Sequence, residues 1–300
     1  MSKKLSWALV LSGGGARGLA HVGFLKELES SGFPRPSLVS GTSMGAIVGG
    51  LYACGIAPAE LYRFILEDFN ISDYMESFAF KLDGPFGQFI QTGQVLASLA
   101  TRPGVDKGQK VLELFENLTE GKNFDETVIP FRCNALDLMS GREVIFRSGS
   151  VSKAMRASMS FPVFFEPLIE NGMCLVDGGL VDNLPVDIAR EEGFNNILAI
   201  NVNHFGPVAA RELRSGPQVI YRSIECTLLF KREEEKAKAD LTIDISDDST
   251  PFSFYRKREF LRLGERAVKT NFKKLEQFFD DTTKDNPKNE IPIKIRGVEI

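Results

Sequence analysis

Short apolar runs alternate with amphipathic segments over the first 55 residues, and this alternation predicts a mixed α/β fold. Residues 7–11 are all apolar, which is typical of a buried strand. Apolar side chains then recur at helical spacing from Leu19 to Leu28, before a Gly-Phe-Pro sequence that ends a helix. A second short strand is expected over 37–40 and a helix of small residues over 44–54. Strand, helix, strand, helix in this order predicts a βαβ unit with parallel strands.

The rest of the chain continues this mixed pattern. Further helices are predicted over 58–68, 107–118, 151–159, 217–239 and 255–280, and further strands over 129–138, 142–146, 174–177, 197–202 and 241–245. Neither an internal repeat nor a linker rich in serine and proline divides it. We therefore expect one domain over 1–300, with a motif-bearing core over about 7–205, a C-terminal extension of helices and a strand over about 206–280, and a polar tail over 281–300.

Composition excludes several other classes of protein. Of the 300 residues 43% are hydrophobic and 25% are charged, which is an ordinary globular mixture. The net charge is −4 and both signs are mixed along the chain, whereas general nucleic-acid binders present a basic face. No stretch approaches the roughly 18 consecutive apolar residues of a transmembrane helix. We therefore expect no nucleic-acid partner and no membrane span.

The cysteines and the first residues indicate a cytoplasmic protein. The four cysteines are scattered and form no Cys-x-x-Cys pair, so they predict buried reduced thiols rather than disulfides or a zinc site. Lys3 and Lys4 precede an apolar run and imitate a secretory signal. That run is short and continues directly into a glycine motif that belongs to the folded structure.

The first motif with chemical meaning is Gly-Gly-Gly-Ala-Arg-Gly at 13–18, between the first strand and the first helix. It matches the dinucleotide pattern G-x-G-x-x-G, but the acidic residue expected about 20 residues later is absent, as is the Gly-Lys-Ser/Thr of a P-loop. Consecutive glycines expose backbone N–H groups, and a helix N-terminus adds partial positive charge. The loop is therefore expected to stabilise an anion.

The second motif is Gly41-Thr-Ser-Met-Gly45, between a strand and a helix. It fits the G-x-S-x-G nucleophile elbow, which exposes a serine hydroxyl at the carboxyl edge of a sheet, although a simple helix start has the same pattern. Both motifs follow neighbouring parallel strands and so emerge at one sheet edge. A nucleophile beside a nest of N–H groups is the arrangement for acyl transfer.

The serine at 43 needs a base, and the sequence offers few candidates. His21 lies in the first helix and is interpreted as a packing or capping residue. His204 follows the strand over 197–202, and Ser43, Asp177 and His204 have the chain order of an α/β-hydrolase triad, but the elbow of that fold follows several strands, not two. Asp177 ends an apolar strand at Gly178-Gly179. It is a second candidate partner, with a plain turn aspartate or a metal ligand as alternatives.

Together, the glycine loop, the elbow and Asp177-Gly-Gly resemble the three signatures of the patatin-like phospholipase family. Residues 157–167 resemble a fourth block, and the resemblance covers about residues 7–205 in the right order. The motif style is similar to bacterial members related to the neuropathy-target-esterase type. The resemblance implies a three-layer α/β/α fold with a mainly parallel central sheet.

For the site, the resemblance implies a Ser43–Asp177 dyad without histidine, so that His204→Ala has little effect. The implied oxyanion hole is the backbone of Gly13, Gly14, Gly15, Ala16, Arg17 and Gly18, chiefly Gly14, Gly15 and Ala16, and the implied elbow glycines are Gly41 and Gly45. Whether Arg17 orients the loop or meets a phosphate stays open. An aspartate with an ordinary pKa near 4 is a poor base, so we expect burial to raise it or the helix N-terminus to activate the serine.

The reaction implied is hydrolysis of a carboxylic ester in a phospholipid or lysophospholipid through an acyl-enzyme, without cofactor or metal. We expect a cytoplasmic enzyme with peripheral membrane contact, and the sequence leaves its oligomeric state unassigned. Acyl-chain contacts are predicted at 161–165 and in an aromatic cap over 74–89. The alternatives are a soluble esterase or thioesterase for small acyl compounds and a non-enzymatic regulatory protein on the same fold.

Overall fold

The computed structural model describes residues 6–75, 103–203, 205–208, 210, 213, 216–245, 247, 249, 253–283 and 298–299. The predicted aromatic cap beyond residue 75, His204 and most of the predicted polar tail lie outside the described residues. Among the described helices, none has the length and apolar character needed to cross a bilayer.

A mixed sheet forms the centre of the fold. The strands are β1 (Ala8–Leu11), β2 (Leu38–Gly41), β3 (Gly104–Asp106), β4 (Phe131–Asp137), β5 (Arg142–Phe146), β6 (Val163–Phe165), β7 (Leu168–Glu170), β8 (Met173–Asp177), β9 (Ile197–Asn201), β10 (Leu241–Asp244) and β11 (Val298–Glu299). The sheet order is β10-β9-β1-β2-β4-β5-β11, with β8 on β4 and β7 on β8, while β3 pairs with β6 separately. The ladders from β10 to β4 are parallel, and β5 and β8 run antiparallel to β4. The predicted mainly parallel sheet is confirmed.

Helices cover the sheet on both faces. They are α1 (Leu19–Ser30), α2 (Met44–Ala53), α3 (Pro58–Glu67), α4 (Ile71–Tyr74), α7 (Gln109–Thr119), α8 (Val151–Ser158), α9 (Val186–Glu191), α10 (Gly216–Lys238), α11 (Lys257–Thr270) and α12 (Phe272–Thr283).

The side chains of β1 point alternately into two hydrophobic cores, one on each face of the sheet. Leu9 and Leu11 join the core built with α1, α2 and α11, and Ala8 and Val10 join the core built with α9. This division produces the predicted three layers.

The single helix predicted over 255–280 is wrong, because the chain forms α11 and α12 with a break at Asn271. The Asn271 side chain and the Asn271 backbone N–H both donate to the Ala267 carbonyl, at 2.9 and 3.1 Å, and the backbone leaves helical geometry at Asn271 with φ −104° and ψ 17°. The short elements β6, β7 and α9 were not predicted; β6 and β7 have three residues each, too few to show a periodicity.

The cysteines differ in part from the prediction of buried thiols. All four are free thiols, and Cys54 and Cys133 are buried, but Cys174 is half-buried and Cys226 is exposed. Cys226 lies on the outer side of α10, the surface helix.

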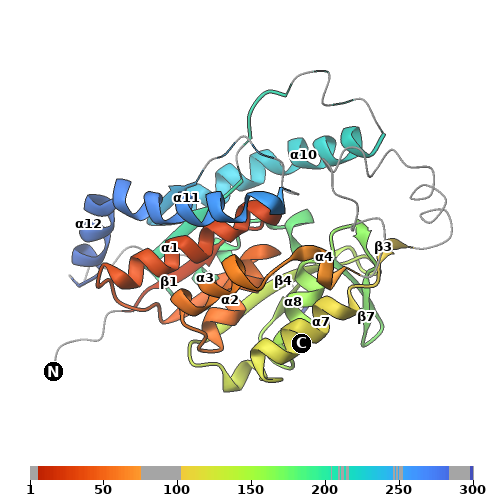
Figure 1. The fold of residues 1–300 in the computed structure, drawn as a ribbon, viewed down its shortest axis with the longest axis horizontal. Helices are drawn as coiled ribbons and strands as arrows, with labels where there is room; N and C mark the ends of the chain where they lie inside the picture. Colours follow the sequence, from red (N-terminus) through yellow and green to blue (C-terminus); the bar gives the residue numbers. More distant parts are fainter. Residues whose placement is uncertain are drawn as a thin grey trace.

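Helices α1 and α11 lie side by side in Figure 1 and pack through glycine on both sides. A Cβ at Gly23 of α1 would overlap the Leu261 carbonyl oxygen, and one at Gly264 of α11 would overlap the Ala20 carbonyl oxygen. The two backbones therefore touch with no room for a methyl group.

We expect Gly23→Ala and Gly264→Ala each to destabilise the fold by about 3 kcal/mol, because the added Cβ meets rigid backbone rather than a side chain that can turn away. Urea unfolding followed by circular dichroism measures the change. Ser30→Ala, at an exposed position of α1, is the matched control and should unfold as the wild type does. Glycine variants as stable as that control would refute the close packing.

Candidate active site

Two strands meet head to head along one side of β4 and bring the candidate dyad together. On one side of β4, β5 pairs with residues 133–137. On the other, β2 pairs in parallel with 131–133 and β8 pairs antiparallel with 135–137. Their carboxyl ends therefore point at each other, with Gly41 opposite Cys133 and Asp177 opposite Ala135. Ser43 and Asp177 come into contact although 134 positions separate them in the chain.

The turn at Ser43 has the geometry of a nucleophile elbow. Ser43 precedes α2 with φ 54° and ψ −121°, a left-handed backbone conformation that is rare for a residue with a side chain. A Cβ at Gly45 would overlap the Leu11 carbonyl oxygen, so the start of α2 packs directly on the end of β1. The tight turn leaves the Ser43 side chain projecting from the sheet edge, as the sequence motif predicts.

The Ser43 hydroxyl donates a hydrogen bond to Asp177 Oδ2 at 2.7 Å. The other carboxylate oxygen, Oδ1, accepts from the Gly179 N–H at 2.7 Å, which fixes the orientation of the carboxylate. Asp177 is buried, and burial raises its pKa to about 7, although both hydrogen bonds act in the opposite direction. A carboxylate with this pKa is matched to proton transfer near neutral pH, which an exposed aspartate is not.

The last residue of α8 and the segment that follows it hold both members of the candidate dyad by their backbones. The Ser43 N–H donates to the Ser158 hydroxyl at 2.9 Å, and the Asp177 N–H donates to the Ser160 carbonyl at 3.0 Å. Both serines are buried. The family resemblance marks this segment, but nothing in the sequence assigned Ser158 this contact. The acyl-chain role predicted for the adjacent residues 161–165 stays a prediction.

The glycine loop lies directly beside Ser43. A Cβ at Gly13 would stand 3.1 Å from the Ser43 Cβ and would overlap the Asn183 side chain. The Gly13 N–H already donates to the Asn183 carbonyl at 3.1 Å. Gly14, Gly15 and Ala16 follow at the start of the 3-10 turn Gly15–Gly18, where the first N–H groups have no acceptor within the turn. These three amides are therefore candidate donors beside the Ser43 hydroxyl.

Other predicted site residues serve the loop rather than the dyad. Gly18 packs on the Met44 side chain, next to the elbow. The Arg17 guanidinium is buried and donates from Nε to the Ser249 carbonyl at 2.8 Å, with Nη2 directed to the same oxygen. Arg17 thus connects the loop to the C-terminal extension, in agreement with an orienting role.

His21 lies beneath the same loop as a neutral packing residue. Its ring is fully buried, with Nε2 2.9 Å from the Ser12 carbonyl oxygen, and burial lowers its pKa to about 4. Among the described residues, no group of three or more His, Cys, Asp or Glu side chains is arranged to hold a metal ion.

Comparison with known proteins gives a family match over the motif-bearing core. The family described as patatin-like phospholipase matches residues 9–190. Two curated relatives are the lysophospholipase NTE1 of Mycosarcoma maydis, 33% identical over 210 residues, and that of Phaeosphaeria nodorum, 34% identical over 197 residues. The alignments cover 69% and 66% of this chain but only 10% and 12% of those proteins, so the chain corresponds to a small part of each. The crystal structure of VipD from Legionella pneumophila superposes with a TM-score of 0.48 and 17% identity, over 94% of this chain and 68% of that one.

Proposed function

From the fact that this chain belongs to the patatin-like phospholipase family, we propose that it hydrolyses a carboxylic ester of a phospholipid or lysophospholipid, with Ser43 as nucleophile and Asp177 as its base. The observation that carries the proposal is the 2.7 Å hydrogen bond from Ser43 to a buried carboxylate, beside a loop with available N–H groups. We further propose that the enzyme acts in the cytoplasm and meets its substrate at a membrane surface.

The mechanism follows from these contacts. Asp177 accepts the proton of the Ser43 hydroxyl as Oγ attacks the ester carbonyl, and the charge that develops on the carbonyl oxygen is stabilised by the N–H groups of Gly14, Gly15 and Ala16. Each such donor can contribute about 3 to 4 kcal/mol to the transition state. Asp177 then returns the proton to the departing alcohol. Asp177 then takes a proton from a water molecule that attacks the acyl-enzyme, and returns that proton to Ser43 Oγ as the fatty acid is released.

A lipid substrate is favoured over the small esters of the alternative hypothesis by the family and by the two curated relatives, which are named as lysophospholipases. The contact between Ser43 and Asp177 also argues against a purely regulatory protein, which has no need of a serine hydroxyl bonded to a buried carboxylate in a strained turn.

We expect kcat/KM for a long-chain lysophospholipid, assayed below its critical micelle concentration, to exceed that for an acetyl or butyryl ester by at least about tenfold. Each buried CH₂ group contributes about 0.8 kcal/mol, so two additional methylenes in the acyl site suffice for this preference. The rate on the lysophospholipid is measured as release of free fatty acid, and the rate on the short-chain ester as release of its alcohol. Ser43→Ala provides the blank for both assays. Equal or greater efficiency on the short-chain ester would favour the small-molecule esterase instead.

A further inference from the structure

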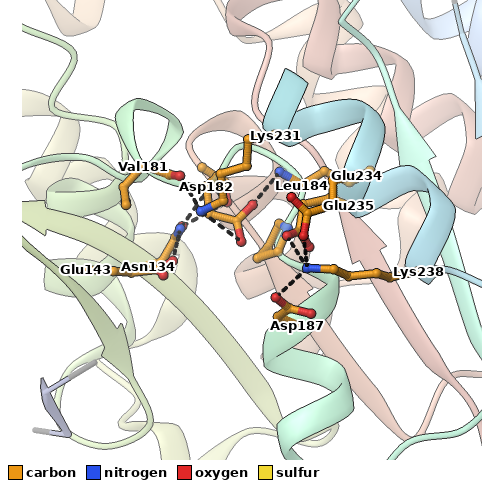
Figure 2. Close-up of polar contacts among 12 residues, drawn as sticks. Asn134, Glu143, Val181, Asp182, Leu184, Asp187, Lys231, Glu234, Glu235 and Lys238 are labelled. Carbon is orange, nitrogen blue, oxygen red and sulfur yellow. Dashed lines mark hydrogen bonds and ion pairs between the residues drawn. The ribbon is translucent and has the colours of Figure 1, made fainter. Parts of the chain in front are cut away.

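A buried asparagine lies between the two strand ends that carry the dyad. Asn134 is in the middle of β4, where the ends of β2 and β8 face each other, and it is fully buried. Its Nδ2 donates to the Asp182 carbonyl at 2.9 Å and to Glu143 Oε1 at 2.7 Å, and its Oδ1 accepts from the Thr42 hydroxyl at 2.8 Å. Figure 2 shows the amide between Glu143 and Asp182. Both N–H groups and the oxygen of this side chain are therefore in use.

The partners of Asn134 are the neighbours of the dyad in the chain. Thr42 directly precedes Ser43, and its hydroxyl is also 3.0 Å from the Asp182 carbonyl oxygen. Asp182 ends the loop that begins at Asp177. In the same loop, a Cβ at Gly178 would overlap Oδ1 of Asn134, so the loop backbone packs directly on the amide. Thr42, Asn134 and Asp182 form a triangle of close polar contacts among buried groups, which we call the clasp: the Asn134 amide donates to the Asp182 carbonyl, and the single Thr42 hydroxyl proton is shared between Asn134 Oδ1 and that carbonyl.

The clasp joins two strand ends that no ladder joins. Strand β2 pairs with β1 and β4, and β8 pairs with β4 and β7, so the end of β2 is not hydrogen-bonded to the end of β8 within the sheet. We propose that Asn134 and Thr42 are positioning residues that hold Ser43 and Asp177 at hydrogen-bonding distance. This inference rests on the proposed function, because it concerns the efficiency of the same dyad.

Helix α10 holds the far side of the clasp. Lys231 of α10 donates from Nζ to the Val181 carbonyl at 2.5 Å and lies 3.9 Å from the Asp182 carboxylate, while Asp182 Oδ1 accepts from the Leu184 N–H at 3.1 Å. Figure 2 shows Lys231 reaching Val181 and Asp182 from α10. The C-terminal extension, which carries none of the sequence motifs, thus supports the loop that positions the catalytic carboxylate.

The test compares Thr42→Val and Asn134→Ala with Thr119→Val, which removes an equally buried threonine hydroxyl on α7 that bonds only carbonyls of its own helix. Misplacement of reacting groups by about 1 Å costs about 100-fold in rate. We expect kcat on lysophospholipid to fall about 100-fold in both clasp variants, KM to stay within about twofold, and the control to match the wild type. When Asp177→Asn is already present, adding Thr42→Val should lower kcat by less than about twofold further, because the clasp acts through Asp177.

Crystal structures of the two variants decide the proposal independently of catalysis. The clasp predicts that the Ser43 Oγ to Asp177 Oδ2 distance grows beyond hydrogen-bonding range. The proposal is overturned if Thr42→Val keeps the wild-type kcat, or if Thr42→Val lowers kcat about 100-fold also when Asp177→Asn is present. It is overturned as well if the distance between Ser43 Oγ and Asp177 Oδ2 stays at 2.7 Å in the variants. If the wild type shows no Ser43-dependent hydrolysis, the proposed function fails, and the distances in the variants still decide the clasp. Thr42→Val nearly conserves volume, so it remains informative if Asn134→Ala does not fold.

Discussion

Ser43→Ala is expected to reduce kcat/KM for lysophospholipid by at least about 10⁴-fold, since loss of a catalytic serine costs even more in well-studied serine hydrolases. The physical reason is that the described hydroxyls next to Ser43 already have other partners. Ser158 accepts the Ser43 N–H, and the Thr42 hydroxyl donates within the clasp. The same substitution should abolish covalent labelling by a fluorophosphonate probe.

The measurement is fatty acid release together with labelling detected by intact mass. Ser30→Ala, at an exposed position of α1, provides the control for a serine lost elsewhere and should be labelled like the wild type. A Ser43→Ala protein that keeps more than a few per cent of the activity, or that is still labelled, would remove the nucleophile from the proposal.

Asp177→Asn is expected to lower kcat/KM by about 10⁴-fold, a loss comparable to that seen when an amide replaces the aspartate of a serine triad. The amide keeps the shape of the side chain but cannot accept the serine proton. His204→Ala should remain close to the wild type, so the pair of variants separates the dyad from the alternative triad. A large loss in His204→Ala would favour the triad.

The pKa of Asp177 gives this prediction a pH signature. Because the pKa is raised to about 7 and the base must be ionised, wild-type kcat/KM should be half-maximal near pH 7 and fall about tenfold per pH unit below it. Between pH 4 and 7 the folded protein binds a proton that the unfolded chain, with an ordinary aspartate pKa, does not. The contribution of Asp177 to the free energy of unfolding is therefore fully present below pH 4 and is lost as the pH rises through 7.

Asp177→Asn removes this loss, because an amide has no charge to bury. The variant should be more stable than the wild type at pH 8, by up to about 4 kcal/mol, and similar to it at pH 4. Urea unfolding at the two pH values measures the difference. An equal effect at both values would mean that the carboxylate is not strongly perturbed in the folded protein.

Local sequence was sufficient to identify most of the longer elements and the motifs they carry. Apolar runs such as 7–11 and glycine-rich turns are local signals, because burial and backbone sterics act on neighbouring residues. They correctly placed the glycine loop and the elbow at the ends of two adjacent parallel strands, where Leu11 pairs with Gly41. The same signals failed at Asn271, where the backbone leaves helical geometry although the apolar pattern continues.

The chemistry of the site depends instead on contacts between remote segments. No local pattern shows that β2 and β8 share one side of β4, that Ser158 receives the Ser43 N–H, or that Asn134 joins the two strand ends. The raised pKa of Asp177 likewise comes from its burial in the folded protein, which no local pattern shows. The chain carries the residue types for hydrolysis and the turns that expose them. Their separation and protonation depend on strand pairing and desolvation, which arise only once distant segments pack together.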